Sequence, residues 1–121
     1  MFLAETNRIR QLLHLSFVGV VSPSDLSHSV EEVRFLLADL TPGFVLLTDL
    51  SRLETMDLAC EAQIGRLMDV CRERGVGRII RVVPEPSKDI GLNILSIFHY
   101  NAGTRAIVCD SLPEAARHLS P

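Results

Sequence analysis

The stretch FVLLTDLSRLETMDLAC, residues 44–60, decides the fold that the sequence predicts. Its first part, residues 44–49, is an apolar run that ends in Thr48 and Asp49, which is typical of a central strand buried on both faces. Its last part leads to Asp57, which can cap a helix with one apolar face. That apolar face consists of Cys60, Ile64, Leu67, Met68 and Cys71. The stretch therefore predicts a buried strand followed by an amphipathic helix.

The segment before this stretch predicts a further strand region and a further helix. Residues 8–21 are rich in β-branched and aliphatic side chains, which suits one long strand or a hairpin of two short ones. Gly19 is a candidate for a β-bulge within it. The turn and cap residues at 22–25 precede apolar positions at helical spacing over residues 30–40. We expect an antiparallel strand pair at the N-terminal edge, followed by a helix.

The segment after the stretch repeats the alternation of strand and helix. Strands are expected over residues 78–83 and 105–109, and helices over residues 87–98 and 114–119. Alternating strands and helices with connections long enough for crossovers predict parallel strand pairing. The predicted fold is therefore α/β, with a mostly parallel central sheet, an N-terminal antiparallel edge and about four helices packed on it.

Length and composition favour a single folded unit. A chain of 121 residues is too short to form two domains that each bury a core, so residues 1–121 are expected to form one domain. Twelve basic and fifteen acidic residues are spread along the chain, which argues against a nucleic-acid partner. No apolar run approaches the roughly 20 residues needed to span a membrane, so a cytoplasmic location is expected.

The cysteines and histidines do not form a recognisable metal motif. Three cysteines without a CxxC pair indicate reduced, buried thiols and neither a disulfide framework nor a zinc site. The four histidines lack the HxxxH or HExxH spacing that places two imidazoles on one helix face. These histidines are His14, His28, His99 and His118. No metal site and no cofactor are predicted.

Motifs for catalysis are also missing from the sequence. GxGxxG, GxxxxGK[ST] and GxSxG do not occur. Asp49, at the end of a predicted central strand, stands where a response-regulator receiver keeps its phospho-acceptor. A receiver also needs acidic residues after its first strand and a lysine after its last, and Lys88 is the only lysine here. We predict no catalytic residues and expect a protein that is not an enzyme; chemistry at a cysteine or at Asp49 is the least favoured hypothesis.

The order of elements, with Met56 and Asp57 opening the second long helix, resembles the STAS family, which includes bacterial anti-sigma factor antagonists. In such antagonists, the resemblance implies, the aspartate at this helix start is followed by a serine or threonine that a partner kinase phosphorylates. Asp57 matches the aspartate, but Leu58 stands at the position of the phospho-acceptor. The usual phosphorylation switch is therefore not expected to operate.

The resemblance implies that a partner protein binds at the loop over residues 51–55 and the following helix start. The implied contact residues are Ser51, Thr55, Met56, Asp57, Leu58, Ala59 and Cys60. Thr55 and Ser51 are the remaining hydroxyls that could accept phosphate, although a cap or a solvent-facing residue is the favoured explanation of Thr55. Leu58 is either an exposed apolar contact point or a helix residue turned into the core.

Two functions follow from the resemblance. The first is a non-enzymatic regulatory module that binds a kinase-like anti-sigma factor or a similar regulatory protein. The alternative is a STAS-like and SEC14-like protein that holds a small apolar ligand or lipid, with the apolar helix over residues 90–100 as a lid, although helical periodicity also explains that helix as core. A homodimer through a free N-terminal sheet edge is a further hypothesis.

Overall fold

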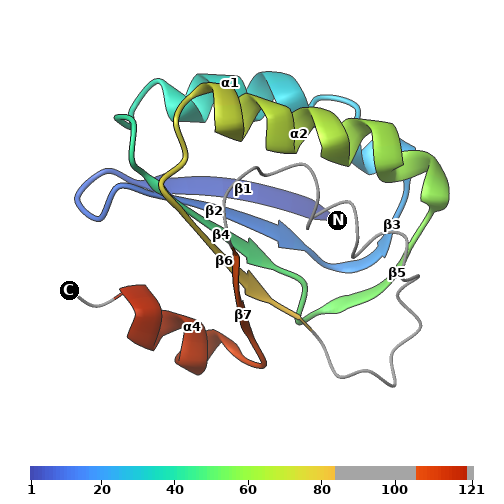
Figure 1. Cartoon of the computed structure of the whole chain (residues 1–121). Coiled ribbons are helices and arrows are strands. Elements are labelled where there is room, and N and C mark those ends of the chain that lie inside the picture. The colour runs from blue at the N-terminus through green and yellow to red at the C-terminus, as the bar shows by residue number, and fades with distance from the viewer. Residues whose placement is uncertain (84–105, 120–121) are drawn as a thin grey trace.

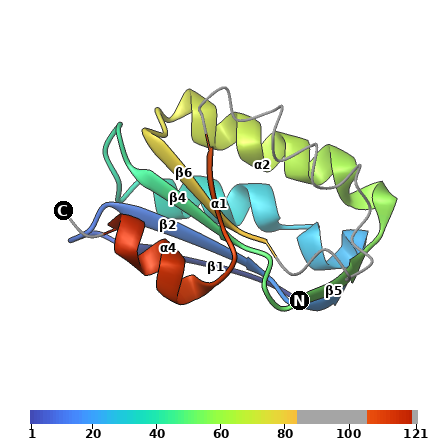
Figure 2. The ribbon, with the colours of Figure 1, turned by 60° about the horizontal axis from the view of Figure 1, so that its bottom comes forward.

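A computed structural model describes residues 1–83 and 106–119 of the protein, and these residues form helices on both faces of a central sheet (Figure 1). The helices α1 (Ser29–Leu37) and α2 (Glu61–Glu73) lie together on one face. Helix α4 (Leu112–Leu119) crosses the opposite face (Figure 2). These are the three α-helices of the described residues; the helix expected over residues 87–98 lies outside them.

The sheet has five strands among the described residues, in the order β1-β2-β4-β6-β7. These strands are β1 (Phe2–Asn7), β2 (Leu12–Phe17), β4 (Val45–Asp49), β6 (Arg78–Val82) and β7 (Ala106–Cys109). The pair β1 and β2 is antiparallel, and the other three pairs are parallel. The predicted α/β fold, with a mostly parallel sheet and an N-terminal antiparallel edge, is confirmed.

The N-terminal hairpin begins earlier than the sequence predicted. β1 starts at Phe2, and residues 8–11, which were expected to lie in a strand, form the turn, with Gln11 in the left-handed region at a φ of 51°. β1 has no second neighbour among the described strands, which leaves the free edge that the homodimer hypothesis requires. Dimerisation itself stays a prediction.

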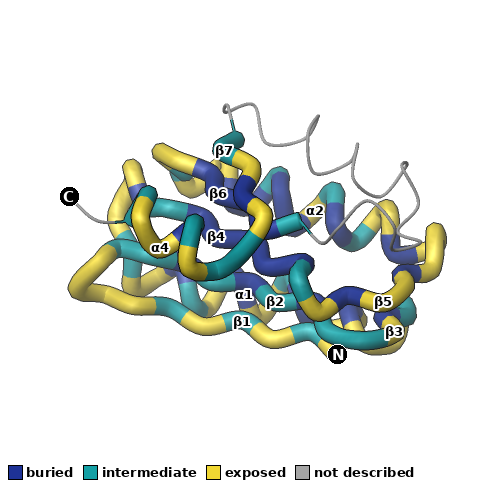
Figure 3. The backbone as a smooth tube through the Cα atoms, turned by 90° about the horizontal axis from the view of Figure 1, so that it is seen from below, coloured by how far each residue is buried: buried dark blue, intermediate teal, exposed yellow. Residues whose placement is uncertain are grey.

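Two apolar clusters fill the space on either side of the sheet. The larger lies between the sheet and helices α1 and α2, and it contains the whole predicted apolar face of α2, whose five members are at most 1% exposed. The smaller lies under α4 and contains Leu47, Ile80, Val82, Cys109 and Ala115. Figure 3, seen from the side of α4, shows the buried central segments of β4 and β6. No helix of the described residues is long and apolar enough to cross a bilayer.

Gly77 lies where two connecting loops touch. Gly43 N donates to Gly75 O at 2.7 Å, and Gly77 N donates to Phe44 O at 2.8 Å, so the loops before β4 and β6 run backbone against backbone. A Cβ at position 77 would lie 2.6 Å from Gly43 O.

We expect Gly77→Ala to lower the free energy of unfolding by roughly 1–3 kcal/mol, because the clash is with backbone and cannot be relieved by a rotamer change. Urea denaturation followed by circular dichroism measures this change. An unchanged midpoint with an unchanged slope would contradict the close approach of the two loops.

Candidate functional site

The predicted site lies beyond the carboxyl end of β4, beside a small second sheet (Figure 1). Strand β5 (Leu53–Met56) pairs in parallel with β3 (Gly19–Val21), with Val20 opposite Thr55. Gly19 has a φ of 69°, and the register shifts between Gly19 and Val20, at the position of the predicted bulge, although the additional residue, Glu54, lies on β5. The sequence predicted a loop over residues 51–55, and this prediction is wrong for residues 53–55, which belong to β5. Only the two ends of β5 are buried, so the strand leaves no alternating apolar pattern in the sequence.

Asp57, which the sequence predicted as a helix cap, caps the 3₁₀ turn that leads into α2 and not α2 itself. Its backbone is extended, with φ −63° and ψ 135°, and its Oδ1 accepts a hydrogen bond from Ala59 N at 2.8 Å. Asp57 N donates to Val21 O at 3.1 Å, which ties the cap to β3. A short 3₁₀ turn, Leu58–Cys60, then leads directly into α2. The helix start is thus held in place by the side chain of Asp57 and by the hydrogen bond between Asp57 N and β3.

The predicted contact residues divide into exposed and buried sets. Thr55, Asp57, Leu58 and Ala59 are exposed, Ser51 is half-buried, and Met56 and Cys60 are buried. Leu58 is 55% exposed, so its side chain is not turned into the core. Met56 and Cys60 belong to the core cluster and support this surface from inside.

Val20 on β3 is a second exposed apolar side chain beside this segment, at 65% exposure. We define the docking surface as Val20, Thr55, Asp57, Leu58 and Ala59. Sequence reasoning missed Val20 because the pairing of β3 with β5 joins positions that are far apart in the chain.

Two carboxylates, Asp25 and Asp57, accompany the docking surface. Asp25 lies in the 3₁₀ turn η1 (Pro23–Leu26), and hydrogen bonds from Ser22 hold the pKa of its carboxyl below the usual value. Burial raises the pKa of the Cys60 thiol, and the charges of Asp57 and Asp25 raise it further. The turn η1 contacts the 3₁₀ turn that follows Asp57, so both carboxylates lie near the start of α2. The apolar surface is therefore flanked by negative charge.

Ser51 and Thr55, the two candidate phosphate acceptors, differ in their surroundings. The Ser51 hydroxyl donates to Asp49 Oδ1 at 2.6 Å, and Ser51 N donates to the same oxygen at 2.9 Å. Asp49 is buried at the carboxyl end of β4, where it holds the turn that leads to β5. Thr55 is exposed on β5. Thr55 is therefore the more accessible hydroxyl of the two.

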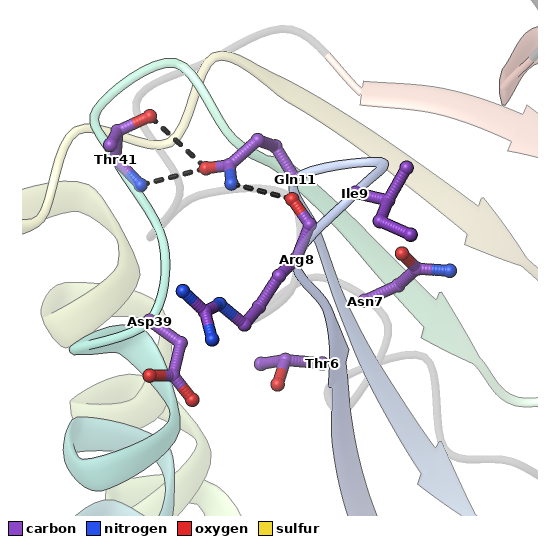
Figure 4. A pocket seen from close by; sticks show the side chains of 7 residues that line it. All are labelled: Thr6, Asn7, Arg8, Ile9, Gln11, Asp39 and Thr41. Carbon is purple, nitrogen blue, oxygen red and sulfur yellow. Dashed lines mark hydrogen bonds between the residues drawn. The ribbon is translucent and has the colours of Figure 1, made fainter.

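A shallow pocket of about 810 Å³ lies at the end of the sheet opposite the predicted site (Figure 4). Its wall is built on Gln11, whose Oε1 accepts hydrogen bonds from Thr41 N at 2.8 Å and Thr41 Oγ1 at 3.0 Å. The pocket lies between the β1–β2 turn and the loop before β4, near the amino ends of the parallel strands. Ligands of open α/β sheets bind beyond the carboxyl ends. The pocket contains none of the predicted site residues, so we do not assign function to it.

The structure also groups three side chains that the sequence search did not connect: Cys109, Glu114 and His118. The HxxxH and HExxH motifs consist of histidine pairs, whereas here a glutamate and a histidine stand four residues apart on α4 and a cysteine ends the preceding strand. The three cysteines are free and buried, as predicted. The apolar helix over residues 90–100, the expected lid of the lipid-binding alternative, lies outside the described residues.

No protein-family model and no curated protein matches this sequence. Solved structures match it over nearly the whole chain, and these structures share one architecture. The protein therefore has a STAS-like fold. In particular, the chain is similar to the anti-sigma factor antagonist SpoIIAA in its unphosphorylated form, with a TM-score of 0.63, 16% identity and coverage of 98% of this chain and 96% of that chain.

Two further structures show the same fold. A SpoIIAA-like protein from Shewanella loihica matches with a TM-score of 0.68 and 15% identity, over 99% of this chain and 93% of that chain. An anti-sigma factor antagonist from Mycobacterium paratuberculosis matches with a TM-score of 0.60 and 15% identity, over 98% of this chain and 92% of that chain.

Proposed function

We propose that this protein is a non-enzymatic regulatory module that binds a partner protein through the docking surface. The observation that carries the proposal is the exposed Leu58 directly after the capping Asp57. SpoIIAA, whose fold this chain shares, has been solved in both a phosphorylated and an unphosphorylated form. Leu58 has no hydroxyl, so phosphate cannot be added at this position to change the charge of the surface.

The docking surface combines exposed apolar side chains with nearby negative charge, as the centre of a small protein–protein interface can. Two exposed aliphatic side chains, Val20 and Leu58, come from adjacent segments and present apolar area that a partner can cover. Asp25 and Asp57 flank them and favour basic residues on the partner. The partner class that fits is a kinase-like anti-sigma factor or a similar regulatory protein, with an apolar pocket bordered by positive charge.

We expect Leu58→Asp to weaken partner binding about ten-fold or more, since it places a charge at the centre of the apolar contact. A pull-down with the wild-type chain, read by mass spectrometry, identifies the partner, and titration calorimetry with the purified partner measures the dissociation constant. Phe35→Asp is the matched control, because Phe35 is 78% exposed on α1 and lies outside the docking surface. Equal binding by wild type and Leu58→Asp would refute the assigned surface.

Asp57 needs a paired test because it is both a helix cap and a charge. Asp57→Asn retains an oxygen that can accept from Ala59 N, whereas Asp57→Arg removes the cap and reverses the charge. We expect Asn to leave thermal stability nearly unchanged and to weaken binding most at low salt, and Arg to abolish binding. If neither variant changes the dissociation constant, the negative charge at this helix start plays no part in recognition.

A further inference from the structure

The end of β7 and one face of α4 bring together a thiol, a carboxylate and an imidazole. Cys109 is the last residue of β7, and Glu114 and His118 stand one helical turn apart on α4. Helix α4 packs against β6 and β7 on the face of the sheet away from α1 and α2 (Figure 2). One ligand atom from each of the three side chains lies within 4.8 Å of the other two. The fold, and not a contiguous motif, creates this cluster.

These three groups form a donor set that suits zinc. Zinc binds thiolate sulfur at about 2.3 Å and imidazole nitrogen or carboxylate oxygen at about 2.0–2.2 Å, in tetrahedral geometry. Those bond lengths separate the donor atoms by roughly 3–4 Å, so small side-chain rotations close the present spacing. We propose that Cys109, Glu114 and His118 bind one Zn²⁺ ion, with the fourth position open to water or to an incoming ligand.

The surroundings of the cluster support a cation. Cys109 is buried at the end of β7, and the carboxylate of Glu114 lies near its sulfur. A divalent cation between the sulfur and the carboxylate would stabilise the thiolate directly. The thiol proton leaves to solvent when the metal binds. The carboxylate of Glu114 thus supplies negative charge at the place where the cation would lie.

Hydrogen bonds at the start of α4 orient the carboxylate. Glu114 Oε2 accepts from Asp110 N at 2.8 Å, and Glu114 N donates to Ser111 Oγ at 3.3 Å. These contacts set the position of Glu114 relative to the end of β7, as groups around a metal site commonly do for its ligands. A bound ion would join β7 to α4 and fasten this short helix over the smaller apolar cluster. The inference is independent of the docking surface, which lies around the start of α2.

The test uses the full chain after treatment with a chelator and dialysis. Titration of Zn²⁺ against a competing chromogenic chelator should give one equivalent bound. Titration with Co²⁺ should give a thiolate-to-metal charge-transfer band and the visible bands of a four-coordinate ion. We expect Cys109→Ser and His118→Gln each to weaken Zn²⁺ binding at least ten-fold, and Cys109→Ser to remove the charge-transfer band. His28→Gln is the matched control, since His28 is exposed at the start of α1.

Circular dichroism of each metal-free variant verifies that it is folded before its affinity is compared. The Co²⁺ spectrum of the wild-type chain needs no variant, so the proposal can be tested even if Cys109→Ser does not fold. A wild-type spectrum without a thiolate band would overturn the proposal. The same conclusion would follow if folded His118→Gln and Cys109→Ser bound Zn²⁺ as tightly as His28→Gln.

Discussion

Phe17→Ala is expected to lower the free energy of unfolding by about 3–5 kcal/mol, which is the usual cost of removing a buried aromatic ring. Phe17 is fully buried at the end of β2 and belongs to the larger apolar cluster. The centroids of the Phe17 and Phe2 rings lie 5.2 Å apart, at an interplanar angle of 58°. The substitution therefore also removes a favourable tilted ring contact. A loss of this size is a large part of the roughly 5–15 kcal/mol that stabilises a typical domain.

Phe35→Ala provides the matched control for this measurement. Phe35 is the same residue type but is 78% exposed on α1, so its removal is expected to change the free energy of unfolding by about 0.5 kcal/mol or less. Chemical denaturation of both variants in parallel gives the two values. Equal losses for Phe17→Ala and Phe35→Ala would mean that β2 does not pack its odd-numbered side chains against the helices.

The second large effect is expected in alkaline solution. Burial raises the pKa of the Cys71 thiol from 9.0 to about 12. Between these values the thiol is ionised in the unfolded chain but still protonated in the folded protein, so the unfolded state binds fewer protons. The contribution of this thiol therefore lowers the free energy of unfolding as the pH rises above 9, by on the order of 3 kcal/mol near pH 11. Below pH 9 the thiol contributes no pH dependence.

Cys71→Ala isolates this contribution. The variant has a lower stability at neutral pH because it leaves a small cavity, so the slopes with pH are compared and not the absolute values. Burial lowers the pKa of Arg81 to about 10, which acts in the opposite direction in the same pH range, but Arg81 is present in both proteins and cancels in the difference. We expect the curve of Cys71→Ala to be flatter above pH 9. Parallel curves would show that the thiol ionises as readily in the folded protein as in the unfolded chain.

The strands that could be predicted are those whose two faces are both covered. β4 and β6 carry apolar side chains on successive positions because helices pack on both sides of the sheet, and this makes them visible in the sequence even though Arg81 interrupts the run in β6. The helix α2 was equally clear, since all five residues of its predicted apolar face are buried. The alternation of these elements was enough to predict the parallel sheet, and the β-rich residues before them indicated β2 but not its antiparallel partner β1.

The parts that were missed depend on contacts between distant positions. β1 is an edge strand whose residues are alternately half-buried and exposed, and its exposed position at Leu3 hides the period in the sequence. β5 pairs with β3, and it carries no alternating apolar pattern of its own. Cys109, Glu114 and His118 meet only because α4 folds back under β7. The residue types were visible in each case, but their proximity follows from the tertiary fold.

The pairing of β3 with β5 has a consequence for anyone who wishes to imitate or block the docking surface. The cap at Asp57 is held by Val21 O, and Gly19 N donates to Arg52 O at 2.9 Å, so the shape of residues 52–58 is imposed by a strand that lies more than thirty positions earlier. A synthetic peptide copied from residues 51–60 would lack this template and would sample many conformations in water. A useful mimic must therefore carry both strands, joined by a linker that the natural chain does not have.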